Sequence, residues 1–150
     1  MDLSKLKWVL VGLVVIGGGW LVTEGGINWV YNNATEATPG ADLEKDNIDE
    51  STLSRYGGFL LHTFRYEKAK RFYQTAIDRY PDGAKLWWNY YQMARCEEKL
   101  YNYQRAADIL HMLWSEDAHQ YDKHVDGKPT LKLRLDTLVE VHELERYDGR

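Results

Sequence analysis

The clearest signal of the fold is the stretch from residue 56 to residue 81, YGGFLLHTFRYEKAKRFYQTAIDRYP. In the second half of the stretch, apolar side chains recur at steps of three and four, the spacing that lines up one face of a helix. Gly57, Ala69 and Ala76 are small where two helices must approach closely. Tyr73 is large enough to fill the space between those helices. The stretch therefore predicts two short antiparallel helices joined by a tight turn.

Pro81 ends this unit, because it has no backbone N–H and biases the residue before it away from helical geometry. These residues at these spacings resemble the tetratricopeptide repeat, a helix–turn–helix unit of about 34 residues. Leu53 replaces the Trp that the family usually carries near the start of the unit. When the unit is counted from near Glu50, the positions that agree with the family pattern are Gly57, Tyr66, Ala69, Tyr73, Ala76 and Pro81.

A second repeat is expected to follow, because one unit cannot bury its apolar face alone. Counted from Ala84, it places Trp87 where the family often has Trp, and Tyr91 where the first unit has its small glycine. Ala106 agrees with the family pattern if about three residues are inserted around residues 97–100. The second repeat is therefore expected to be a degenerate copy of the first.

After the second repeat, residues 130–147 are expected to form a final helix. One face of this helix would cap the exposed end of the repeat stack; it carries, at helical spacing, Leu131, Leu135, Leu138, Val139 and His142. Leu133 and Leu144 point to the other side, where they are either partly buried or part of a contact surface. The expected soluble fold is all-α, a short array of hairpins similar to tetratricopeptide repeats with a C-terminal capping helix.

An uncharged apolar run occupies residues 8–22, and the span counted from Leu6 to Thr23 approaches the length of about 20 residues that a membrane-spanning helix needs. A cleaved signal peptide has the same basic start and apolar centre, but no clean A-x-A cleavage site follows the run. We therefore expect an N-terminal single transmembrane helix that stays attached to the chain. Its glycines either let a neighbouring membrane helix approach closely or are merely tolerated; they are Gly12, Gly17, Gly18 and Gly19.

The basic residues near the apolar run predict its orientation. Lys5 and Lys7 precede the run, and the next Lys or Arg is Lys45. Because basic residues near a span stay in the cytoplasm, the N-terminus is expected there and the repeats across the membrane, in the periplasm of a bacterium. Three parts follow along the chain: a transmembrane anchor with an interfacial segment (residues 1–31), a polar acidic linker (32–47) and a repeat domain (48–150).

Composition and motifs exclude several classes of function and of binding site. The net charge of −4 argues against a nucleic-acid protein. Cys96 is the only cysteine, so an internal disulfide is excluded. A polar loop carries His119 and His124. The stretch that starts at Asp122 begins like a calcium-binding loop, but Leu133 stands at the position where such a loop needs a bidentate Glu. A solvated loop is favoured over a metal site, and no metal or cofactor is predicted.

Aromatic residues are abundant, with six Trp and eleven Tyr in 150 residues, and some of them are available for a partner. Trp88 and Tyr101 are expected to project away from the repeat core. Trp and Tyr are favoured anchors at protein interfaces, so these two side chains are candidate contacts for a partner protein. The alternative is that the aromatic residues serve core packing alone.

No catalytic arrangement is found, since the chain has no G-x-S-x-G, phosphate-binding glycine loop, H-E-x-x-H or C-x-x-C-H motif. The resemblance to tetratricopeptide repeats implies a helical surface that holds another protein. The expected function is a non-catalytic scaffold, an accessory subunit that stabilises an integral membrane protein complex of respiratory, photosynthetic or translocation type. The alternatives are a periplasmic chaperone-like factor beside the protein-export channel, and an organellar import receptor of reversed topology.

Overall fold

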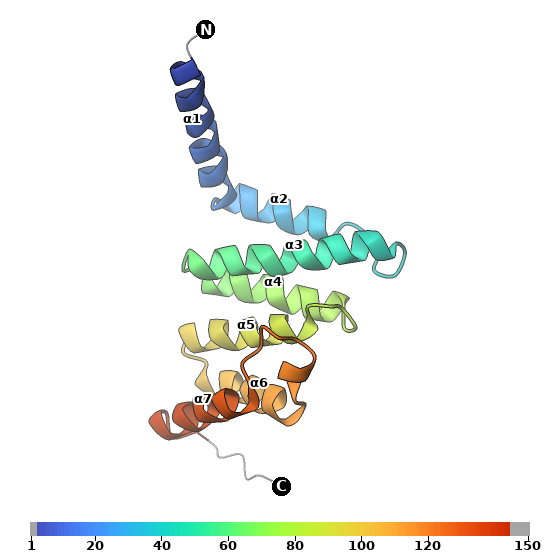
Figure 1. Cartoon of the computed structure of the whole chain (residues 1–150), viewed down its shortest axis with the longest axis vertical. Helices are drawn as coiled ribbons and strands as arrows, with labels where there is room; N and C mark the ends of the chain where they lie inside the picture. The colour runs from blue at the N-terminus through green and yellow to red at the C-terminus, as the bar shows by residue number, and fades with distance from the viewer. Residues whose placement is uncertain (1–2, 145–150) are drawn as a thin grey trace. The chain divides into compact units, whose positions relative to one another are not determined.

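Figure 1 shows a computed structural model of the chain, which describes residues 3–144, except the side chains of residues 3–5, 13 and 14. The described residues form helices and no strand, which confirms the all-α expectation. The chain divides into two compact units, residues 1–37 and residues 38–150. The helices in chain order are α1 (Leu3–Leu21), α2 (Glu24–Thr35), α3 (Leu43–His62), α4 (Tyr66–Arg79), α5 (Leu86–Lys99), α6 (Tyr103–Ser115), the 3₁₀ turn η1 (Ala118–Gln120) and α7 (Lys128–Val141).

The first unit contains α1 and α2, which meet at a sharp corner at Thr23. The Thr23 hydroxyl donates a hydrogen bond to the carbonyl oxygen of Trp20 (2.6 Å) and accepts one from the backbone N–H of Gly26 (3.3 Å). Thr23 thus caps the N-terminus of α2. Gly26 is needed at this corner, because a β-carbon there would collide with the carbonyl oxygen of Trp20.

This corner corrects the expectation of one continuous helix over residues 6–23, because α1 ends at Leu21. Among the described residues, no single helix is both long and apolar enough to cross a membrane. Leu6–Leu21 and Glu24–Thr35 pass by length and composition only when taken together, and they are bent by 76°. α2 also contains the expected interfacial segment and the first residues of the expected linker.

The second unit is a stack in which each helix from α3 to α7 packs on the next (Figure 1). Asp42 begins the stack, because its carboxylate accepts hydrogen bonds from the backbone N–H groups of Glu44 (2.9 Å) and Lys45 (3.2 Å). This is the N-cap arrangement, which satisfies donors that a helix leaves free at its start. α3 therefore begins inside the stretch that was expected to be a linker.

The contact between α3 and α4 contains the small residues noted in the sequence. A β-carbon on Gly57 would lie 3.0 Å from two carbons of the Tyr73 ring, so the helices touch at this point. Ala69, Tyr73 and Ala76 are completely buried. α4 ends just before Pro81, and the backbone then turns into the approach to α5.

The turns within the two helix pairs share one backbone geometry. Phe64 and Tyr101 are both left-handed, with φ angles of 62° and 64°. Counted back from these residues, Ala94 corresponds to Gly57 and is completely buried, so the second pair also has a small residue there. The sequence pattern predicts Tyr91 at this position, with an insertion after it, and this alignment is wrong. Instead, α5 runs unbroken through most of that stretch.

Two buried polar contacts join α3 to the second helix pair. Ser54 donates a hydrogen bond to the amide oxygen of Asn89 at 2.6 Å, and both residues are buried. The Glu50 carboxylate accepts the backbone N–H of Lys85 at 2.8 Å and fills the space that a β-carbon on Gly83 would need. Burial raises the pKa of Glu50, and this effect outweighs the lowering by the hydrogen bond from Lys85.

The last helix, α7, packs on α6 and buries Leu131 and Leu135. It ends earlier than expected, because Glu143 is left-handed (φ 51°) and the N–H of Leu144 turns back to the carbonyl oxygen of Val139 (3.0 Å). A left-handed residue of this kind is a common way to end a helix. The expected end of the helix lies outside the described residues.

Candidate protein-binding surfaces

The loop between α6 and α7, residues 116–127, folds back over aromatic side chains of α5. The ring of Tyr121 stacks on that of Trp87, with 5.7 Å between centroids and 20° between the planes. The Tyr91 hydroxyl donates a hydrogen bond to the Asp126 carboxylate at 2.6 Å. Val125 is buried. The loop is thus packed on α5, whereas the sequence favoured a solvated loop.

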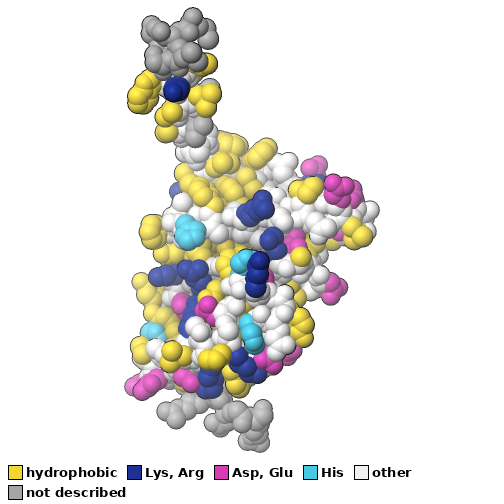
Figure 2. Space-filling view, in the orientation of Figure 1, with side chains coloured by type: hydrophobic (Ala, Val, Ile, Leu, Met, Phe, Trp, Pro, Cys, Tyr) yellow, Lys and Arg dark blue, Asp and Glu magenta, His cyan; other side chains and the backbone are white. Residues whose placement is uncertain are grey.

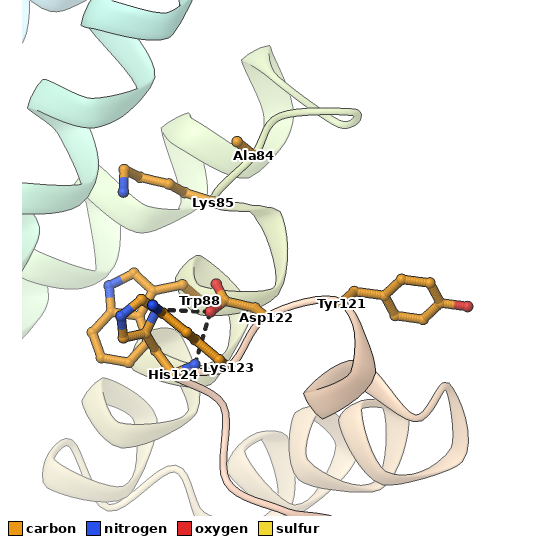
Figure 3. A pocket seen from close by; sticks show the side chains of 7 residues that line it. All are labelled: Ala84, Lys85, Trp88, Tyr121, Asp122, Lys123 and His124. Atoms are coloured by element: carbon orange, nitrogen blue, oxygen red, sulfur yellow. Dashed lines mark hydrogen bonds and ion pairs between the residues drawn. The ribbon is translucent and has the colours of Figure 1, made fainter.

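Trp88, one of the predicted partner anchors, is half-buried in an open hollow of about 410 Å³ near the start of α5 (Figure 3). The His124 ring meets the Trp88 indole edge-on, with centroids 5.8 Å apart. Two lysines add positive charge, and Figure 3 shows Tyr121 extending away from the other side chains. The hollow is lined by Ala84, Lys85, Trp88, Tyr121, Asp122, Lys123 and His124.

The acidic and histidine residues of this loop bond to one another. Asp122 accepts a hydrogen bond from the backbone N–H of His124 (2.9 Å), and the same carboxylate oxygen lies 2.9 Å from Nδ1 of that ring. In the part of the chain that the structure describes, no group of three or more His, Cys, Asp or Glu is placed to hold a metal ion. Cys96 is buried, and burial raises the pKa of its thiol to about 12.

Tyr101 and Leu144 line a second open hollow, of about 530 Å³, at the other end of α5. The fully buried carboxylate of Glu97 lies 3.0 Å from Nε of Arg105 and 3.6 Å from Nζ of Lys70. Two cations therefore share one carboxylate, which leaves this hollow with a positive character.

Stacked rings form the floor beside Tyr101. The Tyr103 ring lies flat on the His142 ring, with 3.4 Å between centroids and 11° between planes. The Tyr101 ring meets that of Tyr103 edge-on, at 6.1 Å. The end of α7 is thereby joined to the turn before α6.

The four side chains that the sequence suggested as soluble partner contacts lie in different places. Tyr101 and Leu144 share one hollow, whereas Trp88 lines the hollow near the opposite end of α5. Leu133 is exposed on α7. They do not form one surface, so a partner that used all four would have to wrap around several helices.

Phe64 is an exposed aromatic residue that the sequence reasoning did not select. It occupies the same turn position as Tyr101, and its ring meets that of Tyr66 edge-on at 6.2 Å, as Tyr101 meets Tyr103. A signal was present in the sequence: in both repeats, an aromatic residue stands two positions before the Tyr that begins the second helix.

The glycines of α1 have open surroundings. A β-carbon on any of them would find no atom within 4 Å; they are Gly12, Gly17, Gly18 and Gly19. Packing within the described chain therefore does not require glycine at these four positions.

The fold is that of a helix–turn–helix repeat protein. Its helices form pairs, small residues lie at the contacts within each pair, and each helix stacks on the next. Residues 53–83 and 88–118 each match the tetratricopeptide repeat. These two segments are thus similar to tetratricopeptide repeats, which suggest a protein–protein interaction scaffold in a family that is typically non-catalytic. No curated protein and no solved structure matches the chain significantly.

Proposed function

We propose that this protein is a non-catalytic scaffold, held at a membrane by its N-terminal helix and attached as an accessory subunit to a membrane protein complex. The observation that carries the membrane part is the surface of α1. At least half of each side chain is exposed at Val9, Leu10, Val11, Val15 and Ile16.

Consecutive helical residues point about 100° apart, so Val9, Leu10 and Val11 face three different directions. Figure 2 shows hydrophobic side chains along this helix. A helix that is apolar on all sides is normally buried, either in a protein core or in a bilayer. The 19 residues of α1 extend about 28 Å, close to the hydrocarbon thickness of a bilayer.

The corner at Thr23 is compatible with a helix that leaves the bilayer at its surface. Trp20 and Trp29 flank this corner, with ring centroids 6.0 Å apart. Trp is enriched at the membrane–water interface, and an amphipathic helix can lie in that layer. In this proposal α2 is an interfacial helix, and α1 alone enters the bilayer.

The proposed location is the bacterial inner membrane, with the N-terminus in the cytoplasm and the repeats in the periplasm. Support comes from Lys5 and Lys7 before the apolar run. Protease added to sealed spheroplasts should digest residues 48–150. Complete protection of that part would reverse the orientation and favour a receptor with cytosolic repeats.

Attachment to the complex is proposed at two places, the glycine positions of α1 and the hollow around Trp88. Gly18→Leu should displace a neighbouring helix without disturbing this chain, because a β-carbon there meets open space. Trp88→Ala should remove a large anchor, and such truncations cost about 2 kcal/mol or more at hot spots. Val9→Leu, on the opposite side of α1, is the matched control.

The measurement is purification of the full chain in mild detergent, followed by identification of the proteins that co-migrate with it. We expect a stoichiometric complex that both Gly18→Leu and Trp88→Ala release and that Val9→Leu retains. Normal co-purification of both variants would rule out the two-point attachment. A chaperone-like factor would instead tolerate Gly18→Leu, because its membrane helix would serve only as a tether.

A further inference from the structure

The turns inside the two repeats carry an unusual pair of residues. We use the name turn edge for these two turns, residues 63–65 and 100–102. At their tips, Phe64 and Tyr101 are each 78% exposed and left-handed. Glycine is the usual residue in that conformation, because a β-carbon crowds the backbone there. Both repeats therefore adopt an unfavourable backbone geometry that leaves a large ring in solvent.

The two tips lie on the same side of the second unit, since α3 and α5 end at the same edge of the stack (Figure 1). Each ring is held edge-on by the Tyr two residues later, at interplanar angles of 86° for Phe64 and 81° for Tyr101. The rings thus protrude in defined positions, one repeat apart.

The charges around the turn edge are mainly positive. Residues 62–71 and 95–105 hold seven Lys and Arg against three Asp and Glu. All three acids are paired: the buried Glu97 with Arg105 (3.0 Å) and Lys70 (3.6 Å), Glu98 with Arg134 (2.7 Å) and Glu67 with Lys70 (3.3 Å). The two segments together carry a net positive charge.

The opposite edge of the same unit is acidic. The segments there, residues 38–50, 78–85 and 116–127, hold eleven Asp and Glu against four Lys and Arg. Figure 2 shows Lys and Arg beside hydrophobic side chains where α5 ends, with some acidic side chains among them, and acidic side chains where α3 begins. The end of α7 also lies against the turn edge, because His142 stacks on Tyr103. It adds Glu140 and Glu143, so with residues 139–144 included this edge holds seven Lys and Arg against five Asp and Glu.

We propose that the turn edge is a membrane-contacting surface: Phe64 and Tyr101 enter the interfacial layer of an anionic bilayer, and the neighbouring Lys and Arg side chains bind lipid phosphates. Tyr is enriched in that layer, Phe is one of the apolar residues by which interfacial helices enter it, and basic residues are attracted to anionic headgroups. The inference rests on the proposed function in one respect, that α1 brings the repeats to a membrane.

A bilayer suits this surface better than a protein partner does. Phe64 and Tyr101 are convex tips, and a protein would need matching pockets at their fixed separation, whereas a fluid interface accepts protruding rings at any spacing. Arg105 lines the same hollow as Tyr101, and its side chain is 62% exposed although it pairs with Glu97, so a cation and a ring can reach a headgroup and the layer beneath it together. The acidic edge would face away from the anionic surface.

The test uses the full chain with phosphatidylcholine vesicles, made with or without phosphatidylglycerol. An environment-sensitive fluorophore is attached to Phe64→Cys or Tyr101→Cys, and the buried Cys96 stays unlabelled. Tyr121→Cys and Leu133→Cys are matched controls, because those residues are 71% and 68% exposed away from the turn edge. Circular dichroism checks that each variant is folded, and lipids brominated on the acyl chains serve as quenchers.

We expect labels at 64 and 101 to shift to the blue and lose intensity with brominated lipid, more strongly with phosphatidylglycerol, while the labels at 121 and 133 do not respond. Lys99→Glu should reduce the response, and Lys123→Glu, on the acidic edge, should not. If the labels at 64 and 101 remain as exposed to water as the control labels, the proposal is wrong. The turn edge would then bind a protein partner or no partner.

Flotation of the same vesicles separates this proposal from the anchor. If the protein still floats with the vesicles after alkaline carbonate treatment, and the labels at 64 and 101 report exposure to water, the result supports the anchor and contradicts the turn-edge contact. If carbonate releases the protein from the vesicles, but the brominated lipid quenches the labels at 64 and 101 before that treatment, the result supports the contact and contradicts the anchor.

Discussion

The ring of Tyr73 lies directly against the backbone of α3 at Gly57. A β-carbon at position 57 would stand 3.0 Å from Cε1 and Cζ of that ring and 3.2 Å from Cε2. The Tyr73 side chain is completely buried, so it has little room to move. Burial also raises the pKa of its hydroxyl well above the ordinary value. The close approach of α3 and α4 is therefore set by one glycine and one ring.

We expect Gly57→Ala to destabilise the second unit by about 1–3 kcal/mol, the usual range for overpacking a core. Gly58→Ala is the matched control, because its β-carbon would lie 3.5 Å from the Tyr73 hydroxyl, an ordinary contact. This control should gain up to about 1 kcal/mol from the better helix propensity of Ala. Denaturant unfolding measures both values, and equal effects at the two positions would contradict the close contact.

Phe64→Gly should raise stability, because it removes a β-carbon from a left-handed backbone, a conformation that costs an L-residue roughly 1–2 kcal/mol. The gain will be smaller than that figure, since glycine also loses more entropy on folding. Thermal unfolding of the full chain in detergent is the measurement. Thr63→Gly, one residue earlier and not left-handed, should destabilise, and a loss at both positions would argue against strain at Phe64.

The loop over α5 is expected to depend on the hydrogen bond from Tyr91 to Asp126. Tyr91→Phe and Asp126→Ala should each destabilise, and a double-mutant cycle should give a coupling of about 1–2 kcal/mol, because the bond reaches a charged group but is only partly buried. Tyr90 lines a different surface, with Gln74 and Met93, so the control substitution Tyr90→Phe should show no coupling to Asp126→Ala. A coupling near zero would mean that the loop is held by other contacts.

Glu50 predicts a specific pH dependence of stability. Because burial raises its pKa in the folded state, the folded chain holds this proton to higher pH than the unfolded chain does. Its stabilising contribution is full below the unfolded value of about 4.5 and declines as pH rises through the folded value. The stability of wild type relative to Glu50→Gln should therefore fall with rising pH above about 4.5. Urea unfolding of both proteins over this pH range measures the difference. A rise of this difference with pH would mean that folding lowers the pKa of Glu50.

The first repeat could be predicted from sequence because its signals are local. Ala69, Tyr73 and Ala76 follow the period of a helix, and Pro81 ends that helix without reference to any distant residue. The second repeat was found with an error in register. Its large aromatic residues obscured the small one, and only the left-handed Tyr101 identifies Ala94 as the counterpart of Gly57.

Three features can be predicted from the sequence alone, because each depends on neighbours a few positions apart: the helical class, the first hairpin and the apolar character of α1. The tertiary structure decided the corner at Thr23, the packing of the loop on α5 and the separation of Trp88 from Tyr101. The bond from Tyr91 to Asp126 joins residues 35 positions apart. Contacts at that distance depend on how whole helices stack, because periodicity reports which face of a helix is buried but not which segment covers it.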